Sequence, residues 1–148
     1  MDSLLSERMA DDLEYTRSDS RYVEISKLLA PAPGEYFVRK HAYSGFFGTR
    51  LDALLRNLDI KTIIFVGFSL DCCLLATMID ALAYNYDVIL LRDCTLATDL
   101  EDELESLSFT RRMITWSEMI VGCSTSSQEF INACDQLARM GSRSKEMV

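Results

Sequence analysis

Apolar residues along the chain fall into runs whose spacing predicts strands alternating with helices. Two runs have almost no polar interruption, Lys61 to Val66 and Asp87 to Arg92, as is typical of parallel strands covered on both faces. We expect the first to be central in its sheet. Between them, Asp71 is placed to cap a helix that runs to about Ala83, because its carboxylate can accept the free N–H groups of a first turn.

Weaker patterns predict the remaining elements. Short strands are expected at Glu35 to Lys40 and Arg112 to Thr115, and Asp93 should begin a loop. Helices are expected from Thr49, as N-cap, to about Leu58, from about 98 to 107, and from Gln128 to Met140. Strands that alternate with helices at short connections favour a parallel sheet with right-handed crossovers. We therefore predict a three-layer α/β/α fold, Rossmann-like, with four strands.

The strongest punctuation is Pro31-Ala32-Pro33-Gly34, where two prolines and a glycine oppose regular structure. It separates a variable, partly helical amino-terminal segment, residues 1–30, from a domain at residues 31–148. At 148 residues the whole chain has about the size of one domain.

Charge and composition narrow the function. The net charge of −8 repels nucleic-acid backbones and anionic membranes, so we expect neither as a partner. No apolar run approaches the roughly 20 residues of a membrane helix. The acidic amino terminus does not resemble a signal peptide, and five cysteines without framework spacing indicate reduced thiols, so we expect a cytoplasmic protein. With one histidine and no C-x-x-C pair, we expect no metal and no cofactor.

The candidate chemistry lies in Thr62 to Thr77, TIIFVGFSLDCCLLAT, where a strand turns at a glycine into a helix. Open α/β sheets place their active sites at such carboxyl edges. A cysteine in the first helical turn is favoured as thiolate near neutral pH. Position alone does not choose between Cys72 and Cys73, which should point about 100° apart around a helix. Two ordinary core cysteines remain an equal alternative.

Motifs on both sides of this stretch occur in a recognisable order. They are Lys40, Ser44 to Phe46, Thr49, Leu51 to Leu58, Gly67, Asp71, Cys73, Thr77, Asp93 and Cys94. Over roughly residues 25 to 120 the chain resembles the isochorismatase-like cysteine hydrolases. Within that family, Lys-x-x-Tyr-Ser-Gly-Phe-Phe at residues 40–47 most resembles the ureidoacrylate and biuret amidohydrolase branch.

The resemblance implies a hydrolase that cleaves a C–N amide or carbamoyl bond of a small amide or ureido substrate through a cysteine nucleophile. Cys73 would be that nucleophile, and Lys40 would stabilise its thiolate and the developing negative charge. The backbone N–H groups of Ser69 and Cys73 would form the oxyanion hole, with a cis peptide before Ser69. Substrate-binding positions implied in the same way are Tyr43, Phe46 and Thr77.

The chain also departs from the family pattern. The general base of the family is an Asp at the end of a first strand, and we find no such strand, so we expect the fold to lack it. Asp11, Asp12 and Asp19 are the carboxylates to test as replacements. The alternatives are a truncated form, a base from another chain in a homo-oligomer, or a catalytically impaired domain that acts as an interaction or regulatory module. A thiol redox protein using the adjacent cysteines is a weaker alternative.

Overall fold

The structure is a computed structural model that describes residues 24–25, 27–98 and 102–145. The chain divides into two compact units, Met1–Phe37 and Val38–Val148. In the first unit the described residues form a 3₁₀ turn, η2 (Lys27–Leu29), and a tight turn in which the Glu35 N–H donates to the Ala32 carbonyl over 3.0 Å. Most of the segment predicted to be partly helical, residues 1–30, lies outside the described residues, and the predicted boundary at residue 30 stays a prediction.

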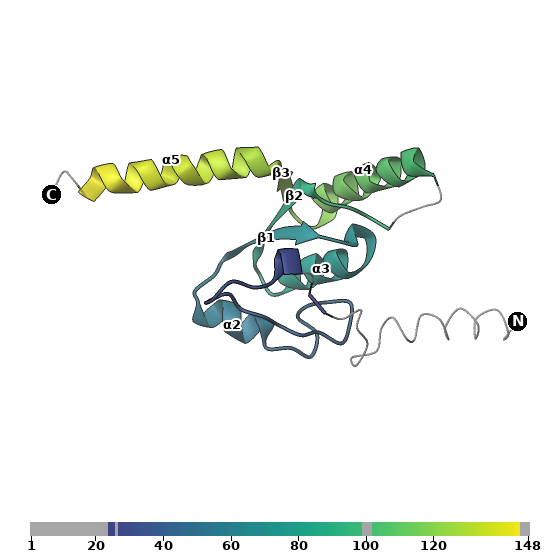
Figure 1. The fold of residues 1–148 in the computed structure, drawn as a ribbon, viewed down its shortest axis with the longest axis horizontal. Helices are drawn as coiled ribbons and strands as arrows, with labels where there is room; N and C mark the ends of the chain where they lie inside the picture. The colour runs from purple at the N-terminus through teal and green to yellow at the C-terminus, as the bar shows by residue number, and fades with distance from the viewer. Residues whose placement is uncertain (1–23, 26, 99–101, 146–148) are drawn as a thin grey trace, which may run out of the picture. The chain divides into compact units, whose positions relative to one another are not determined.

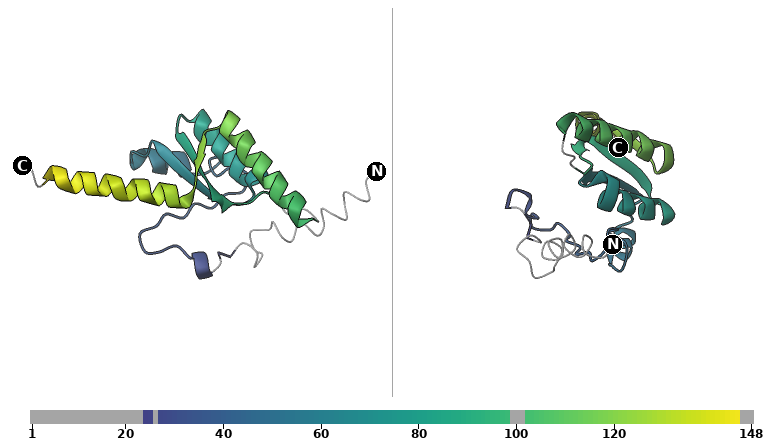
Figure 2. Two further views of the ribbon diagram at one scale, coloured as in Figure 1. Left: turned by 90° about the horizontal axis from the view of Figure 1, so that it is seen from above. Right: turned by 90° about the vertical axis from the view of Figure 1, so that its right-hand side faces the viewer.

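The second unit is built on a parallel sheet of three described strands in the order β1-β2-β3 (Figure 1). The elements in chain order are α2 (Leu51–Asn57), β1 (Thr62–Gly67), η3 (Leu70–Leu74), α3 (Leu75–Ala83), β2 (Asp87–Thr95), α4 (Glu103–Ile120), β3 (Cys123–Thr125) and α5 (Ser127–Lys145). Figure 2 shows α4 running alongside the sheet and α5 leading away from it. The predicted α/β class with a parallel sheet flanked by helices is confirmed.

One face of the sheet carries the hydrophobic core. The register sets Ile63 beside Val88 and Phe65 beside Leu90, and all four belong to the same core cluster. Side chains of α3 and α4 pack in that cluster as well, among them Met78, Ala81, Phe109 and Met113. Helices on consecutive right-handed crossovers in one direction cover the same face, which explains why both contribute to one core.

The opposite face of β1 is more exposed. Val66 on that face is 53% exposed, and Ile64 is half-buried. The expectation that β1 is a central strand covered on both faces is wrong for the described sheet, where β2 is central and β1 lies at an edge. A continuous apolar run does not distinguish a central strand from an edge strand whose second face is only partly covered.

Several predicted element boundaries are corrected. Residues 35–40 have no regular secondary structure, and Asp93 lies within β2 rather than in a loop. Arg112 to Thr115 lies within α4, because the apolar residues Phe109, Met113 and Ile114 share a helical face that packs on the core. The sequence did not predict β3, which is three residues long and too short to show a period.

Close packing explains one glycine beside the sheet. A Cβ on Gly122, just before β3, would lie 2.2 Å from the carbonyl oxygen of Val88 in β2. A side chain at position 122 therefore has no room beside the Val88 carbonyl group. The sulfur of Cys123 lies 4.0 Å from the same carbonyl oxygen, so β3 approaches β2 closely from its first residue.

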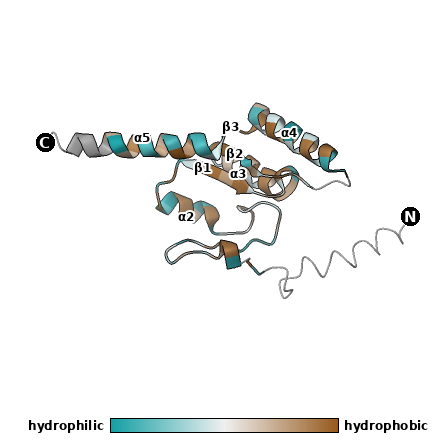
Figure 3. Ribbon diagram, turned by 45° about the horizontal axis from the view of Figure 1, so that its top comes forward, coloured by the Kyte–Doolittle hydropathy of each residue, from teal (hydrophilic) through white to brown (hydrophobic). Residues whose placement is uncertain are grey.

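The helix predicted at Gln128 to Met140 is confirmed as α5, with Asp93 and Glu129 at its start. The Ser127 N–H and hydroxyl donate to the Asp93 carboxylate over 2.8 and 2.6 Å. Figure 3 shows hydrophobic residues along β1, β2 and α3, and both kinds of residue on α5. The apolar side chains of α5 include Ile131 and Leu137, which are 52% and 68% exposed. Among the described residues, no helix is long and apolar enough to cross a membrane.

Candidate active site

The turn after β1 is fixed in position by its own backbone. Gly67 has a φ of 112°, a conformation that glycine adopts without steric cost. The peptide bond between Phe68 and Ser69 is cis, as expected from the resemblance. The next residue, Leu70, is fully buried, and its N–H donates to the Leu96 carbonyl over 2.8 Å. The turn is therefore held against the chain that follows β2.

Both cysteines lie in the π-helical turn η3. Their sulfur atoms are 3.9 Å apart, and each residue is half-buried. We expected Cys72 to point well away from Cys73, as it would in an α-helix. A π turn has more residues per turn, so neighbouring side chains diverge less. The two thiols therefore form a contact pair at the carboxyl end of β1, and all five cysteines of the chain are free thiols.

Burial and nearby charged groups shift the pKa of the Cys72 thiol in opposite directions. Burial raises the pKa of the Cys72 thiol, and the Cys73 sulfur and the Asp71 carboxylate raise it further, whereas Lys40 lowers it. The positive charge of Lys40 thus reaches the sulfur pair. Its ammonium group is exposed and donates a hydrogen bond to the Ala42 carbonyl over 3.0 Å.

Asp71 does not cap the helix, contrary to our prediction. The residue at the N-cap position of η3 is Ser69, and its side chain makes no capping bond. The Asp71 carboxylate instead accepts two hydrogen bonds of 2.7 Å from Thr98, one from the N–H and one from the hydroxyl. Sequence reasoning missed Thr98, because no local pattern links it to a residue 27 positions earlier.

Within the described residues no carboxylate is hydrogen-bonded to Cys73, whose recorded side-chain partner is the Cys72 sulfur. The carboxylates proposed for testing, Asp11, Asp12 and Asp19, lie outside the described residues. The described part of the chain also holds no cluster of three or more His, Cys, Asp or Glu residues able to bind a metal ion.

The predicted oxyanion donors lie on the same turn. The Ser69 carbonyl accepts from the N–H groups of Cys72 and Leu74 over 3.1 Å each. The N–H of Ser69 itself has no backbone acceptor among the described residues. A free N–H in a sharp turn beside a thiol can bind an anionic oxygen. Its assignment to an oxyanion hole with Cys73 stays a prediction.

Thr77 connects the two motifs that the sequence singles out. Its hydroxyl donates to the Cys73 carbonyl over 2.7 Å and accepts from the Gly45 N–H over 3.0 Å. The segment from Lys40 to Phe47 is therefore joined to the turn that carries Cys73. A Cβ on Gly45 would meet the Thr77 methyl group at 3.2 Å, so a larger residue there would require Thr77 to shift.

The two aromatic residues predicted to bind substrate have different surroundings. Tyr43 is 68% exposed, whereas Phe46 is only 5% exposed. The ring of Phe46 packs on Tyr84 and Tyr86, with centroids 5.3 and 5.9 Å apart. Thr49 donates to the Gly45 carbonyl and accepts from the Leu51 N–H, so it connects this segment to the start of α2.

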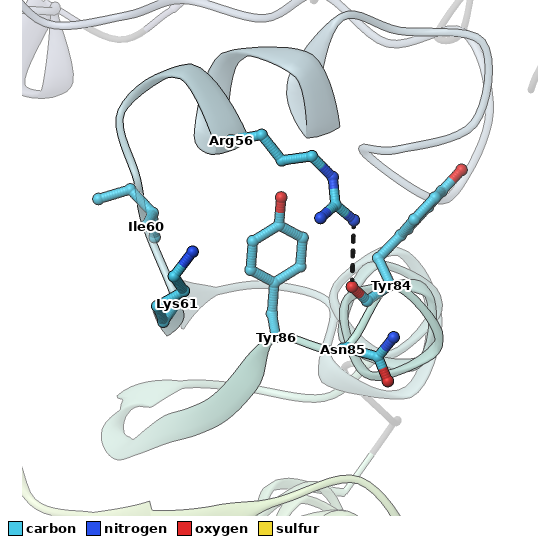
Figure 4. Close-up of a pocket in the computed structure, with 6 residues that line it drawn as sticks. All are labelled: Arg56, Ile60, Lys61, Tyr84, Asn85 and Tyr86. Atoms are coloured by element: carbon cyan, nitrogen blue, oxygen red, sulfur yellow. Dashed lines mark hydrogen bonds between the residues drawn. The ribbon is translucent and has the colours of Figure 1, made fainter.

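A separate cavity of about 310 Å³ lies at the amino ends of β1 and β2 (Figure 4). Its lining residues are Arg56, Ile60, Lys61, Tyr84, Asn85 and Tyr86. The Arg56 guanidinium donates to the Tyr84 carbonyl and pairs with Asp52, and Lys61 pairs with Asp59. None of the predicted site residues lines this cavity, and no sequence motif marked it.

Comparisons with known proteins agree with the resemblance. The sequence profile of the Isochorismatase domain matches residues 7–118. Ureidoacrylate amidohydrolase RutB of Agrobacterium fabrum is 39% identical over 67 residues, which are 45% of this chain and 29% of that protein. The matched residues therefore span less than a third of that relative.

Solved structures show the same likeness. A cysteine hydrolase from Pseudomonas syringae pv. phaseolicola 1448A has a TM-score of 0.76 and 30% identity, covering 87% of this chain and 64% of that one. N-carbamoylsarcosine amidase from Thermoplasma acidophilum has a TM-score of 0.63 and 29% identity, covering 75% of this chain and 58% of that one. Since the family profile matches well over half of the chain, the protein belongs to the isochorismatase family of hydrolases.

Proposed function

We propose that the protein is a cysteine-dependent amidohydrolase that cleaves a C–N bond in a small amide, carbamoyl or ureido compound. The observation that carries the proposal is the hydrogen-bonded connection from Gly45 through Thr77 to Cys73. It joins the Lys40 segment to the turn that holds the cysteine. The relatives named as ureidoacrylate amidohydrolase and N-carbamoylsarcosine amidase support this bond type.

In the proposed reaction the Cys73 thiolate attacks the carbonyl carbon of the substrate. The carbonyl π electrons move to oxygen, and the N–H groups of Ser69 and Cys73 bind that oxyanion. The C–N bond then breaks, and the leaving nitrogen takes a proton and departs as ammonia or an amine. Water then attacks the carbonyl carbon of the resulting thioester. The C–S bond breaks, which releases the acid product and regenerates the free thiol of Cys73.

In this scheme the positive charge of Lys40 offsets the negative charge of the thiolate. Its influence on the sulfur pair supports a role in stabilising the thiolate before attack. Because its side chain is exposed, the ammonium group can also reach an anionic group on the substrate. We assign it electrostatic stabilisation and assign proton transfer to a group outside the described residues.

For substrate binding we propose a direct contact by Tyr43 and supporting contacts through Phe46 and Thr77. Tyr43 is exposed and lies on the segment that Thr77 ties to the turn. Phe46 anchors the same segment in the core. These contacts support a role for the exposed Tyr43 ring in binding the substrate, with Phe46 and Thr77 holding the backbone of its segment.

The partners and the cellular compartment that we propose follow from the net charge and the free thiols. The net charge of −8 supports the absence of a nucleic-acid partner. The five free thiols support a reducing compartment such as the cytoplasm. The hydrolase relatives favour catalysis over a purely regulatory role for the chain.

The test is ammonia release from a panel of N-carbamoyl, ureido and simple amide compounds. We expect the native chain to release ammonia from at least one of them. Cys73→Ser should lose on the order of 10³-fold or more in rate, as nucleophile replacements do. The matched control is Cys94→Ser, which alters an exposed thiol in β2 and should keep the native rate. Equal release by Cys73→Ser and the native chain would overturn the proposal.

A further inference from the structure

The contact between Cys72 and Cys73 has no counterpart in the reaction scheme above. A separation of 3.9 Å between two sulfur atoms is within hydrogen-bonding distance for a thiol donor. A neutral thiol is a weak donor, but an ionised acceptor strengthens the bond. The π-helical turn brings the two sulfurs together without any other chain segment.

We propose that Cys72 is a positioning residue whose S–H donates a hydrogen bond to the Cys73 thiolate and stabilises it for attack. This inference rests on the proposed function, since it concerns the state of the nucleophile in that reaction. Cys72 would then supply part of the stabilisation of the Cys73 thiolate, as neighbouring groups do for other reactive cysteines.

The surroundings explain which sulfur keeps the proton. Burial is the main cause of the raised pKa of the Cys72 thiol, and the adjacent Cys73 sulfur adds to it. Both effects favour the protonated form of Cys72, which is the form that can donate a hydrogen bond. Two interacting thiols lose their protons in successive steps, so the pair carries one negative charge after the first step.

Other groups facing the pair are consistent with a single shared charge. Asp71 is the acidic neighbour, and Thr98 occupies both of its carboxylate oxygens. Lys40 supplies the positive charge, while its recorded hydrogen bond goes to the Ala42 carbonyl. The side chains of α4 that are buried or packed on the core include Phe109, Met113 and Thr110, and none of these is charged. In the structure the Cys73 Sγ donates to the Cys72 Sγ over 3.9 Å. Once Cys73 is ionised it can only accept, so the proton of this bond then comes from Cys72.

The experiment measures alkylation of Cys73 by iodoacetamide between pH 5 and 10, with the modified residue identified by peptide mass spectrometry. Three chains are compared: native, Cys72→Ser, which keeps a donor, and Cys72→Ala, which removes it. We expect Cys72→Ala to react about three- to tenfold more slowly at pH 7, with its pH profile displaced upward. Cys72→Ser should follow the native profile.

A purely structural role would change the rate without moving the pH profile. Cys72→Val serves as a second donor-free variant that fills the volume of the thiol, and it should match Cys72→Ala. Identical profiles for the native chain and both donor-free variants, with Cys73 reactive at pH 7, would overturn this inference alone. A native Cys73 that reacts only above pH 9 would overturn the nucleophile assignment as well.

Discussion

Among single residues, Asp71 follows the family motif but makes a hydrogen-bonded contact that the motif does not indicate. The sequence placed it at the start of a helix, where a carboxylate ordinarily caps free N–H groups. In the structure it binds Thr98 instead and ties the chain after β2 to the cysteine turn. A cap is a local property that sequence can indicate, whereas this contact depends on how the sheet brings two loops together.

Replacing this carboxylate should loosen the turn. We expect Asp71→Ala to lower the free energy of unfolding by about 1 kcal/mol, a reduced value because the bonds are partly exposed. Adding Thr98→Val to Asp71→Ala should cost little more, since the partner is already lost. Urea unfolding of the single and double variants measures the coupling. Asp135→Ala, on the exposed part of α5, is the control, and full additivity of the two changes would contradict the contact.

The family motif singles out Cys73 and Lys40 by their spacing, and their roles stay a prediction. The closeness of Cys72 and Cys73 was not predictable, because it depends on the π turn, and an α-helical period suggests divergence. Phe46 likewise matched a motif position, but only the structure shows that its ring packs against Tyr84 and Tyr86. A sequence motif indicates where a residue lies along the chain, but it does not indicate how deeply its side chain is buried.

At the scale of elements, β1, β2, α3 and α5 were predictable from apolar periodicity. The error in α4 arose because Arg112 to Thr115 contains β-branched residues that favour a strand in isolation. Packing of Phe109 and Met113 on the core outweighs that local preference and continues the helix to Ile120. Asp102 accepts from the Glu105 N–H and so fixes where α4 begins.

The start of α5 should weaken in acid. Hydrogen bonds from Ser126 and Thr125, together with Arg92, lower the pKa of Glu129 from 4.5 to about 2. A carboxyl group with a lowered folded-state pKa stabilises the fold fully above pH 4.5 and loses that contribution as the pH falls toward 2. The native chain should therefore lose thermal stability across this interval.

The comparison variant is Glu129→Gln, which cannot ionise. Its melting temperature should be lower than that of the native chain at pH 6, and the gap should narrow as the pH falls to 2. Circular dichroism melts at half-unit pH steps measure both curves. Glu105→Gln, an exposed glutamate on α4, provides the control. A constant gap between native and Glu129→Gln at every pH would contradict the assignment.

At the scale of the whole molecule, the described sheet ends at β1 with one face only partly covered. An edge strand with unpaired backbone groups and an exposed apolar side chain favours pairing with another chain. Val66 supplies that side chain on β1. We therefore expect the homo-oligomer suggested by the sequence to use this edge.

Sedimentation over a range of concentrations tests this expectation. The native chain, of 16.8 kDa, should show an average mass that rises with concentration. Val66→Lys should weaken self-association about tenfold or more, because pairing would bury an unpaired charge. Leu104→Lys changes a side chain on α4 that is 77% exposed and should have no effect. A chain that stays monomeric at all concentrations, or equal effects of the two lysines, would contradict it.

We propose that Cys73 forms a covalent acyl intermediate during C–N bond cleavage. The most direct measurement is acid quenching of the native chain during turnover of its best ammonia-releasing substrate, followed by peptide mass spectrometry. We predict an added acyl mass on the peptide that contains Cys73, absent after Cys73→Ala, which should also stop ammonia release. Turnover that continues in Cys73→Ala, with no adduct on the native cysteine, would show that Cys73 is not the nucleophile.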